Sequence, residues 1–145
     1  MRIEPATSVD LDSMCALLNA AHLPTDGLAQ HLKTALVARA ADAVIGCVAL
    51  ERYDDLALLR SLVVTDLYRR HGVGQSLAIQ ALELARQQHV TDVYLLTMTA
   101  TAFFAERFGF RVTDRAGGPP SVLQSVEFVS ACPATAQVMV RKIEP

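Results

Sequence analysis

One junction near the middle of the chain constrains the fold most, because an apolar strand runs there into a glycine-containing helix start. Leu56 to Val64 is apolar except for Arg60 and Ser61, and near-continuous apolar strands are usually buried on both faces. A polar turn follows, and Arg69-x-x-Gly72-x-Gly74 then opens an amphipathic helix that ends near His89. The sequence therefore predicts a buried strand connected by a short loop to a helix of an α/β protein.

The chemistry of this junction favours an anion. The first N–H groups of a helix have no partner inside the helix, and the helix dipole adds partial positive charge there. Glycines let the backbone approach a phosphate closely, and Arg69 and Arg70 carry donors suited to phosphate oxygens. Two glycines match neither the P-loop nor the full dinucleotide pattern, so a plain strand-to-helix turn stays open as the alternative.

The hydrophobic periodicity along the rest of the chain predicts alternating strands and helices, with no repeat and no linker. A chain of 145 residues then predicts a single domain over residues 1–145. The strands are expected at residues 1–6, 36–40, 43–51, 56–64, 92–97, 110–112 and 136–142, and the helices at residues 10–21, 25–33, 102–108 and 121–129 and from after Gly74 to about His89.

Charge and composition narrow the possible partners. The net charge is −2 and no basic stripe is visible, which disfavours nucleic acid. The longest apolar stretch, Ala43 to Leu50, is far shorter than the ~20 residues of a spanning helix, and the N-terminus carries no signal segment. No membrane partner and a cytoplasmic location are expected.

The three cysteines, Cys15, Cys47 and Cys132, are too widely spaced for a zinc site or a disulfide framework. No metal is predicted. The three cysteines are expected to be small, buried residues with reduced thiols. A direct arsenite site on them is a minor alternative.

The junction closely resembles motif A of the GNAT-type N-acetyltransferases, [QR]-x-x-G-x-[GA], with Arg69, Gly72 and Gly74 at its three positions. The resemblance covers nearly the whole chain and includes Phe103-Phe104…Phe108-Gly109-Phe110, which is similar to the aromatic helix and "GF" strand start of the family. It implies a central mixed, twisted sheet of about seven strands, splayed between the fourth and fifth and flanked by helices on both faces. It also implies acetyl-CoA as cosubstrate and direct acetyl transfer to an amine.

Four further segments look like the arsenic-resistance-associated GNAT acetyltransferases. They are Leu59-Arg60-Ser61-Leu62, Leu95-Leu96-Thr97-x-Thr99-Ala100, Ser125-x-Glu127-Phe128 and Ala131-Cys132-Pro133-Ala134-x-Ala136. This narrower resemblance implies a detoxifying N-acetyltransferase and does not identify its substrate. A non-catalytic acyl-CoA-binding regulatory module is the alternative.

The family resemblance assigns the donor site residue by residue. The end of the fourth strand would pair with pantetheine through main-chain atoms, and the Leu62 amide would polarise the thioester carbonyl. The loop and helix start would hold the pyrophosphate, and Phe104 is also expected to bind the cofactor. The expected cofactor-binding residues are Leu62, Val63, Val64, Arg69, Arg70, His71, Gly72, Val73, Gly74, Gln75, Ser76 and Phe104.

Proton transfer is where the sequence departs from the family. Many members place a tyrosine acid on the helix before the "GF", but that position falls on Ala105 here, with Phe104 beside it. Water or another side chain must then protonate the thiolate, or it leaves unassisted. Glu51, at the end of a strand predicted to abut the acceptor cleft, is the expected base; a solvated strand-end carboxylate is the alternative.

The acceptor is expected to be a small molecule with an amine, and an anionic group on it is one possibility. The expected substrate-binding residues are His22, Arg60, Ser61, Thr97, Thr99 and Glu127. Arg60 either binds an acidic substrate or pairs with Glu51 or another internal carboxylate, because a buried arginine needs a partner. Ser61 as a core hydroxyl, and Thr97 and Thr99 as helix caps, are the alternatives. Family members are often dimers, so a homodimer is expected.

Overall fold

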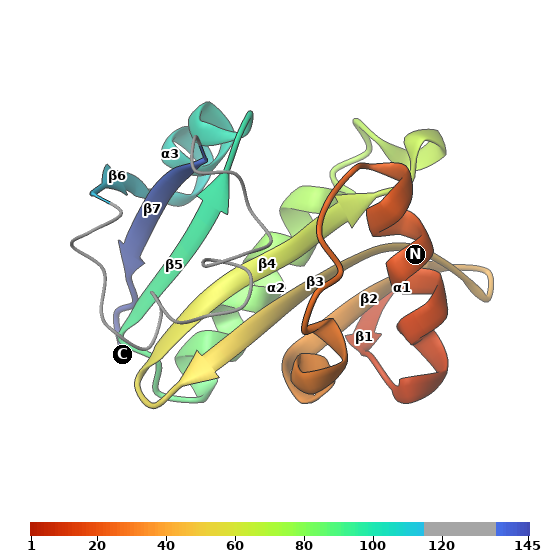
Figure 1. Cartoon of the computed structure of the whole chain (residues 1–145), viewed down its shortest axis with the longest axis horizontal. Coiled ribbons are helices and arrows are strands. Elements are labelled where there is room, and N and C mark those ends of the chain that lie inside the picture. The colour runs from red at the N-terminus through yellow and green to blue at the C-terminus, as the bar shows by residue number, and fades with distance from the viewer. Residues whose placement is uncertain (115–135) are drawn as a thin grey trace.

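The computed structural model describes residues 1–114 and 136–145 (Figure 1). The expected helix over residues 121–129, with Glu127, and Cys132 lie outside these described residues. The elements in chain order are β1 (Arg2–Pro5), η1 (Ser8–Asp10), α1 (Leu11–Ala20), η2 (Leu28–Thr34), β2 (Ala35–Ala40), β3 (Ala43–Tyr53), β4 (Leu56–Val64), η3 (Asp66–Tyr68), α2 (Val73–Gln87), β5 (Asp92–Thr97), α3 (Thr101–Phe108), β6 (Arg111–Thr113) and β7 (Gln137–Lys142), where η marks a 3₁₀ helix.

One mixed sheet organises the described part of the chain. Its seven strands lie in the order β1-β2-β3-β4-β5-β7-β6. All neighbours are antiparallel except β4 and β5, which are parallel and connected through α2. The α/β sheet of about seven strands that the sequence predicts is therefore confirmed. No described helix has the length and apolar character needed to cross a lipid bilayer.

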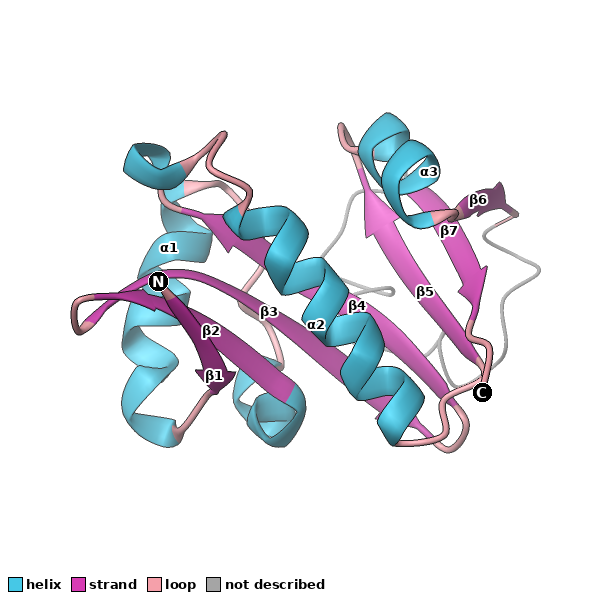
Figure 2. Cartoon of the chain, turned by 180° about the vertical axis from the view of Figure 1, so that it is seen from behind, coloured by secondary structure: helices cyan, strands magenta, loops and turns pink. Residues whose placement is uncertain are grey.

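Helices cover both faces of the sheet. The long helix α2 and the short α3 lie on the face turned to the viewer in Figure 2, and α1 and η2 lie on the other. Alternating residues of each strand supply the two cores: Leu36 packs with the α2 side and Val37 with the α1 side. On β4, Ala57 and Leu58 are both 0% exposed, which confirms that this apolar strand is buried on both faces.

Most element ends lie within about two residues of the sequence prediction, and two of the differences have a clear local cause. The helix expected over residues 25–33 is the 3₁₀ helix η2, and it begins later because Gly27 has a left-handed φ of 76°. Strand β3 continues past Glu51, since Tyr53 still pairs with Leu56 across a tight turn. Asp54 makes this turn possible with a φ of 56°, a conformation that aspartate tolerates better than most residues.

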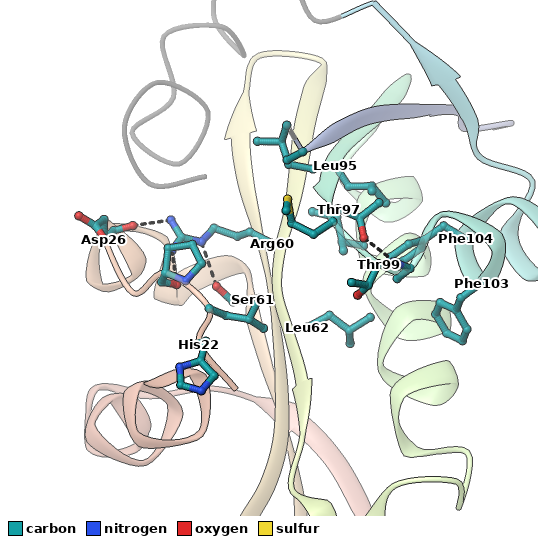
Figure 3. A pocket seen from close by; sticks show the side chains of 17 residues that line it. His22, Asp26, Arg60, Ser61, Leu62, Leu95, Thr97, Thr99, Phe103 and Phe104 are labelled. Carbon is teal, nitrogen blue, oxygen red and sulfur yellow. Dashed lines mark hydrogen bonds between the residues drawn. The ribbon is translucent and has the colours of Figure 1, made fainter. Parts of the chain in front are cut away.

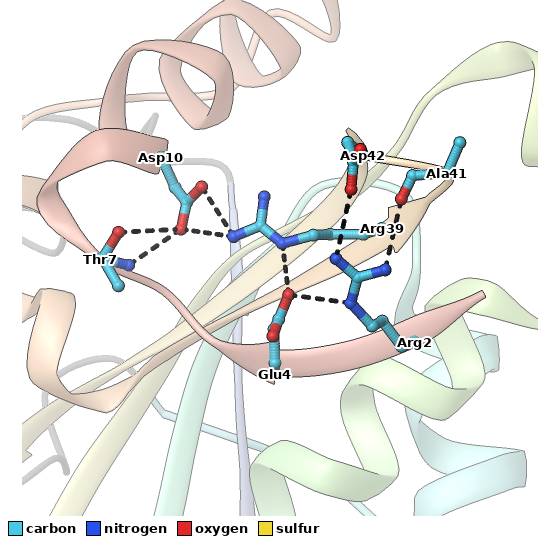
Figure 4. Close-up of polar contacts among 7 residues, drawn as sticks. All are labelled: Arg2, Glu4, Thr7, Asp10, Arg39, Ala41 and Asp42. Carbon is cyan, nitrogen blue, oxygen red and sulfur yellow. Dashed lines mark hydrogen bonds and ion pairs between the residues drawn. The ribbon is translucent and has the colours of Figure 1, made fainter.

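A buried carboxylate connects the start of α1 to the edge of the sheet (Figure 4). Asp10, only 4% exposed, accepts hydrogen bonds from Arg39 Nη2 at 2.8 and 2.9 Å. It also accepts one from the Thr7 amide at 2.9 Å. The Nε of Arg39 donates to Glu4 on β1. Three separate segments are thus joined through one guanidinium.

Replacing Asp10 with asparagine is expected to lower stability in a pH-dependent way. Burial acts to raise the pKa of Asp10, but the Thr7 amide and Arg39 outweigh it and hold the pKa below its usual range. The stabilisation is present above the ordinary aspartate pKa and is lost as pH falls through the lowered one. Asp10→Asn should cost about 1–3 kcal/mol of unfolding free energy at neutral pH, and less near pH ~3.

Urea denaturation across this pH range measures the effect. Asp12→Asn, in the exposed first turn of the same helix, is the matched control and should change the unfolding free energy by less than about 0.5 kcal/mol. Equal, pH-independent losses in both variants would contradict the role of the buried carboxylate.

Candidate active site

The sheet opens between its two parallel strands. Strands β4 and β5 pair only from Leu56–Leu59 to Asp92–Leu95, and beyond that seam they diverge (Figure 1). β5 instead pairs with β7 along its whole length, from Asp92 to Thr97. The splay expected between the fourth and fifth strands is therefore present, and it leaves a gap at the end of β4.

A β-bulge lies on β4 where the gap opens. The register along β3 passes from Cys47 opposite Val63 to Ala49 opposite Arg60, so two β4 residues share one β3 partner. Within this bulge Ser61 has a φ of 60°, a left-handed value that costs about 1 kcal/mol or more for a residue with a side chain. Bulges redirect side chains and main-chain groups, and this one puts Ser61 and Leu62 in the wall of a cavity.

Two cavities meet at the gap. The first has a volume of about 820 Å³ and the second about 760 Å³; both are within the range of small-molecule sites. The residues that line both of them are Leu23, Leu62, Thr99, Ala100 and Phe103. Because Leu62 borders both, this residue lies where two ligands in adjacent cavities would touch.

The second cavity lies at the start of α2. Gly72 precedes this helix with a left-handed φ of 78°, and no side chain caps the helix N-terminus. The first amide groups of α2 are therefore available to an anion, which the helix dipole also favours. Arg69 and Arg70 line the same cavity, and Arg69 is held by the Val64 carbonyl at 3.2 Å and by Asp66 at 3.0 Å.

Most of the expected cofactor-binding residues come together here. Those that line the second cavity are Leu62, Val63, Val64, Arg69, Arg70, Gly72, Val73, Gly74 and Gln75. His71 and Ser76 are in the same loop and helix start but are not among the described lining residues. Phe104 lines the first cavity instead. The cofactor roles of all these residues stay predictions.

Arg107 also lines the second cavity, and the sequence analysis missed it. It donates to Gln75 Oε1 at 3.0 Å and lies 6.0 Å from the centroid of the Phe103 ring, a cation–π geometry. It therefore bridges α3 and the start of α2 across the gap. The sequence did contain a signal for the contact with Phe103, because Arg107 follows Phe103 by one helical turn and so lies on the same face of the helix.

The first cavity collects the expected acceptor-side residues (Figure 3). Of the expected substrate-binding set, His22, Arg60, Ser61, Thr97 and Thr99 line it, and Glu127 lies outside the described residues. Leu23, Pro24, Asp26 and Met98 also line it and were not expected. The other walls are apolar and are formed by Leu59, Leu95, Leu96, Phe103 and Phe104.

Thr97 has a second role in the fold. Its hydroxyl oxygen accepts the Ala100 amide at 2.9 Å, immediately before α3 begins. This contact precedes the helix, whose N-terminus has no side-chain cap, while the Thr97 side chain still borders the cavity. A ligand that displaced this side chain would also loosen the start of α3.

Glu51 lies behind the cavity wall. It is 1% exposed, it is not among the described residues that line either cavity, and its Oε2 accepts Arg60 Nη1 at 2.7 Å. The Tyr53 hydroxyl donates to its other oxygen at 2.5 Å. The alternative of a solvated strand-end carboxylate is therefore wrong. Arg60 pairs with Glu51 in the described part of the chain, as one of its expected alternatives has it.

His31 completes this buried polar cluster. Its Nε2 is 3.9 Å from Glu51 Oε1, and its ring meets Tyr53 edge-on with centroids 6.5 Å apart. Burial lowers the pKa of His31 and Arg60 lowers it further, which outweighs the opposite effect of Glu51. The imidazole is therefore neutral near pH ~7, so among the described residues the charges of this cluster are those of Arg60 and Glu51.

The structure agrees with the departure from the tyrosine acid. Phe104 is buried and lines the first cavity, whereas Ala105 is exposed and lines neither cavity. Neither Tyr53 nor Tyr94 is among the described lining residues of either cavity, and Tyr68 borders only the second. Helix α3 therefore carries no phenol at this cavity.

The Cys47 thiol is expected to be unreactive in the folded protein. It is 0% exposed, and its S–H donates to the Ser61 carbonyl at 3.3 Å. Burial raises its pKa to about 12, whereas the thiolate is the reactive form. At pH ~8, iodoacetamide should label the partly exposed Cys15 and leave Cys47 unlabelled until urea unfolds the chain. Peptide mapping by mass spectrometry reads this out, and equal labelling of both thiols in the native protein would contradict it.

Comparison with known proteins agrees with this geometry. The sequence profile of the "Acetyltransferase (GNAT) domain" family matches residues 31–112, which contain β3, β4, α2, β5 and α3. The chain therefore belongs to the GNAT acetyltransferase family.

Sequence identity to individual relatives is low. An uncharacterized N-acetyltransferase, CT2212 of Chlorobaculum tepidum, is 29% identical over 98 residues, which is 67% of this chain and 62% of that protein. N-acetylglutamate synthase from Neisseria gonorrhoeae, solved with coenzyme A and N-acetyl-glutamate, superposes with a TM-score of 0.84 and 20% identity, covering 99% of this chain and 35% of that one. Rv2747 of Mycobacterium tuberculosis, solved in complex with CoA, gives a TM-score of 0.81 and 20% identity, covering 99% of this chain and 100% of that one.

Proposed function

We propose that this protein transfers the acetyl group of acetyl-CoA directly to the amine of a small molecule. The observation that carries the proposal is the pair of adjoining cavities that share Leu62. One cavity has the helix N-terminus and arginines that suit a pyrophosphate. The other has the size for a small acceptor. A shared border lets the two ligands react without a covalent enzyme intermediate.

The reaction then needs little chemistry from side chains. A neutral amine attacks the thioester carbonyl, and the developing oxyanion is stabilised by the Leu62 N–H at the bulge. The C–S bond breaks, and the thiolate takes a proton from water, because Phe104 and Ala105 occupy the place of a phenolic acid. The ammonium that forms on the acceptor loses its proton to solvent. Alignment of the two ligands supplies most of the rate.

The donor half of the proposal is supported from two sides. The helix start at Gly72 to Ser76 and the basic residues Arg69, Arg70 and Arg107 make the second cavity suitable for phosphates. Beyond the β4–β5 seam, no strand of the described residues pairs with β4 on the β5 side, which suits a strand-like pantetheine arm. Two solved structures with the same fold, N-acetylglutamate synthase from Neisseria gonorrhoeae and Rv2747, were obtained with coenzyme A.

For the acceptor, we propose a class of molecule and no single compound. The first cavity suits a molecule of amino-acid size, and one structural neighbour was solved with N-acetyl-glutamate. An amino-acid-like toxin would fit the resemblance to the arsenic-resistance group, so detoxification is the proposed biological role. That role is tested separately, by asking whether expression of the gene protects a sensitive bacterium from amine-bearing amino-acid toxins.

A thiol-release assay over a panel of amino acids, their amides and simple amines tests the activity, together with calorimetric titration of acetyl-CoA. Binding with release of CoA thiol for at least one amine class supports the proposal. Binding without release for every amine favours the alternative, a regulatory module that holds acyl-CoA, which the missing tyrosine also favours. No binding at millimolar acetyl-CoA excludes both.

A further inference from the structure

Arg60 is buried in the wall of the acceptor cavity, and its donors are directed at protein atoms. Nη1 donates to the Glu51 carboxylate at 2.7 Å and to the Asp26 carbonyl at 2.6 Å, while Nε donates to the Ser61 hydroxyl at 3.0 Å. Nη2 lies 3.5 Å from the Pro24 carbonyl. The side chain is 0% exposed. Such a guanidinium acts as a structural cross-link.

The cross-link reaches a segment with little structure of its own. Residues 21–27, here called the acceptor loop, connect α1 to η2, and four of them line the first cavity (Figure 3). His22 and Gly27 both have left-handed φ values, of 58° and 76°. Two main-chain carbonyls between them, those of Pro24 and Asp26, face Arg60. The tip of the acceptor loop is therefore held to β4 through one side chain.

Glu51 stabilises the buried guanidinium of Arg60. A guanidinium buried without a counter-charge would be strongly unfavourable, and a well-oriented carboxylate offsets that cost. Glu51 lies on the neighbouring strand, opposite Leu58. Its two oxygens are engaged by Arg60 and Tyr53, which leaves the carboxylate badly oriented for taking a proton from a ligand in the cavity.

We propose that Glu51 and Arg60 form a positioning pair that fixes the acceptor loop and thereby sets the affinity for the acceptor amine. Glu51 orients the guanidinium, and the guanidinium holds the Pro24–Asp26 carbonyls. Neither side chain exchanges a proton with the acceptor or binds an acidic group on it. The proposal rests on the proposed acetyl transfer, because its kinetic readout is turnover of an amine.

Three variants test the pair: Glu51→Gln, Arg60→Lys and the double variant Glu51→Leu/Arg60→Met. The double variant removes both members of the described pair together, so neither is left buried without the other and the chain should fold, but it lacks the donors to both carbonyls. In each variant the KM for the amine should rise about 10- to 100-fold. The kcat should fall less than the KM rises, and the Kd for acetyl-CoA should stay within about twofold.

Two results would overturn the proposal. A catalytic base at Glu51 would make Glu51→Gln lower kcat by about 10²-fold or more and remove the acidic limb of the pH–rate profile. A direct contact between Arg60 and an acceptor carboxylate would make the Arg60→Lys penalty disappear when an amino acid is replaced by its decarboxylated amine. The positioning role predicts an unchanged acidic limb and the same penalty for both amines.

The matched control is Arg52→Lys. Arg52 is a partly buried arginine next to Glu51 on β3, but it bonds Gln88 and the Asp54 carbonyl and lines neither cavity. Its kinetics should match the wild type, and an equal rise in KM would contradict the specific role of Arg60.

Hydrogen exchange separates failure of this proposal from failure of the proposed function. In the double variant the amides of residues 21–27 should exchange faster, while those of α2 stay unchanged. This readout needs no turnover, so it decides the positioning role even if no amine is acetylated. Unchanged exchange in the acceptor loop would overturn it.

Discussion

A variant with an ester oxygen in place of the Leu62 amide N–H should lose about 10²- to 10³-fold in kcat, the usual cost of one oxyanion donor. The reason is positional: Leu62 lies in the β4 bulge, and both cavities border it. The change removes a single hydrogen-bond donor and keeps the leucine side chain. It is made by incorporating the α-hydroxy analogue of leucine at position 62, and thiol release at saturating substrates measures it.

The matched control places the same ester at Ile79, which is 51% exposed on α2. That variant loses a backbone donor of the same kind at a residue that lines neither cavity, and it should keep its kcat. The Kd for acetyl-CoA reports whether the Leu62 ester still folds and binds its donor. A Leu62 ester with normal kcat would assign carbonyl polarisation to another group.

Gly74→Asp should raise the Kd for acetyl-CoA about 100-fold or more, because it puts a carboxylate where the pyrophosphate is proposed to bind. Gly74 is the second residue of α2. A Cβ there would lie 3.6 Å from a Val64 methyl group, an ordinary contact. A carboxylate in the first turn stabilises a helix by about 0.3–1 kcal/mol. Weak binding would therefore reflect charge repulsion in a folded protein.

Calorimetric titration measures this effect, with thermal unfolding as the check on folding. Gln80→Glu, on the exposed part of the same helix, adds the same charge away from the second cavity and should bind acetyl-CoA normally. Gly74→Ala should lie between the wild type and Gly74→Asp. If Gly74→Asp bound as tightly as the wild type, the phosphates would have to lie elsewhere.

Local sequence patterns were enough for much of the fold. The apolar run that became β4 and the glycine-marked start of α2 depend on neighbours in the chain, so their burial and order could be predicted. Element ends were less certain, because the turn at Asp54 and the late start of η2 depend on left-handed residues, which a hydrophobic pattern does not reveal.

The acceptor site was harder to predict because its contacts are distant in sequence. Arg60 and the Asp26 carbonyl are 34 residues apart, and no periodicity indicates that a backbone carbonyl will meet a guanidinium. The pairing with Glu51 was one of several alternatives, since any internal carboxylate would have satisfied a buried arginine. The bulge at Ser61 was equally hidden, because it depends on the register between β3 and β4.

Because β4 and β5 pair along only a short seam, a small rotation at that seam produces a larger displacement at the far ends of the two strands. From Arg60 to Val64, β4 extends beyond the seam by about 17 Å at ~3.3 Å per residue. Each degree of rotation at the seam thus moves the far end of β4 by about 0.3 Å relative to β5. Buried side chains at the seam that line neither cavity, such as Ala57 and Val93, consequently control the width of a mouth they do not touch.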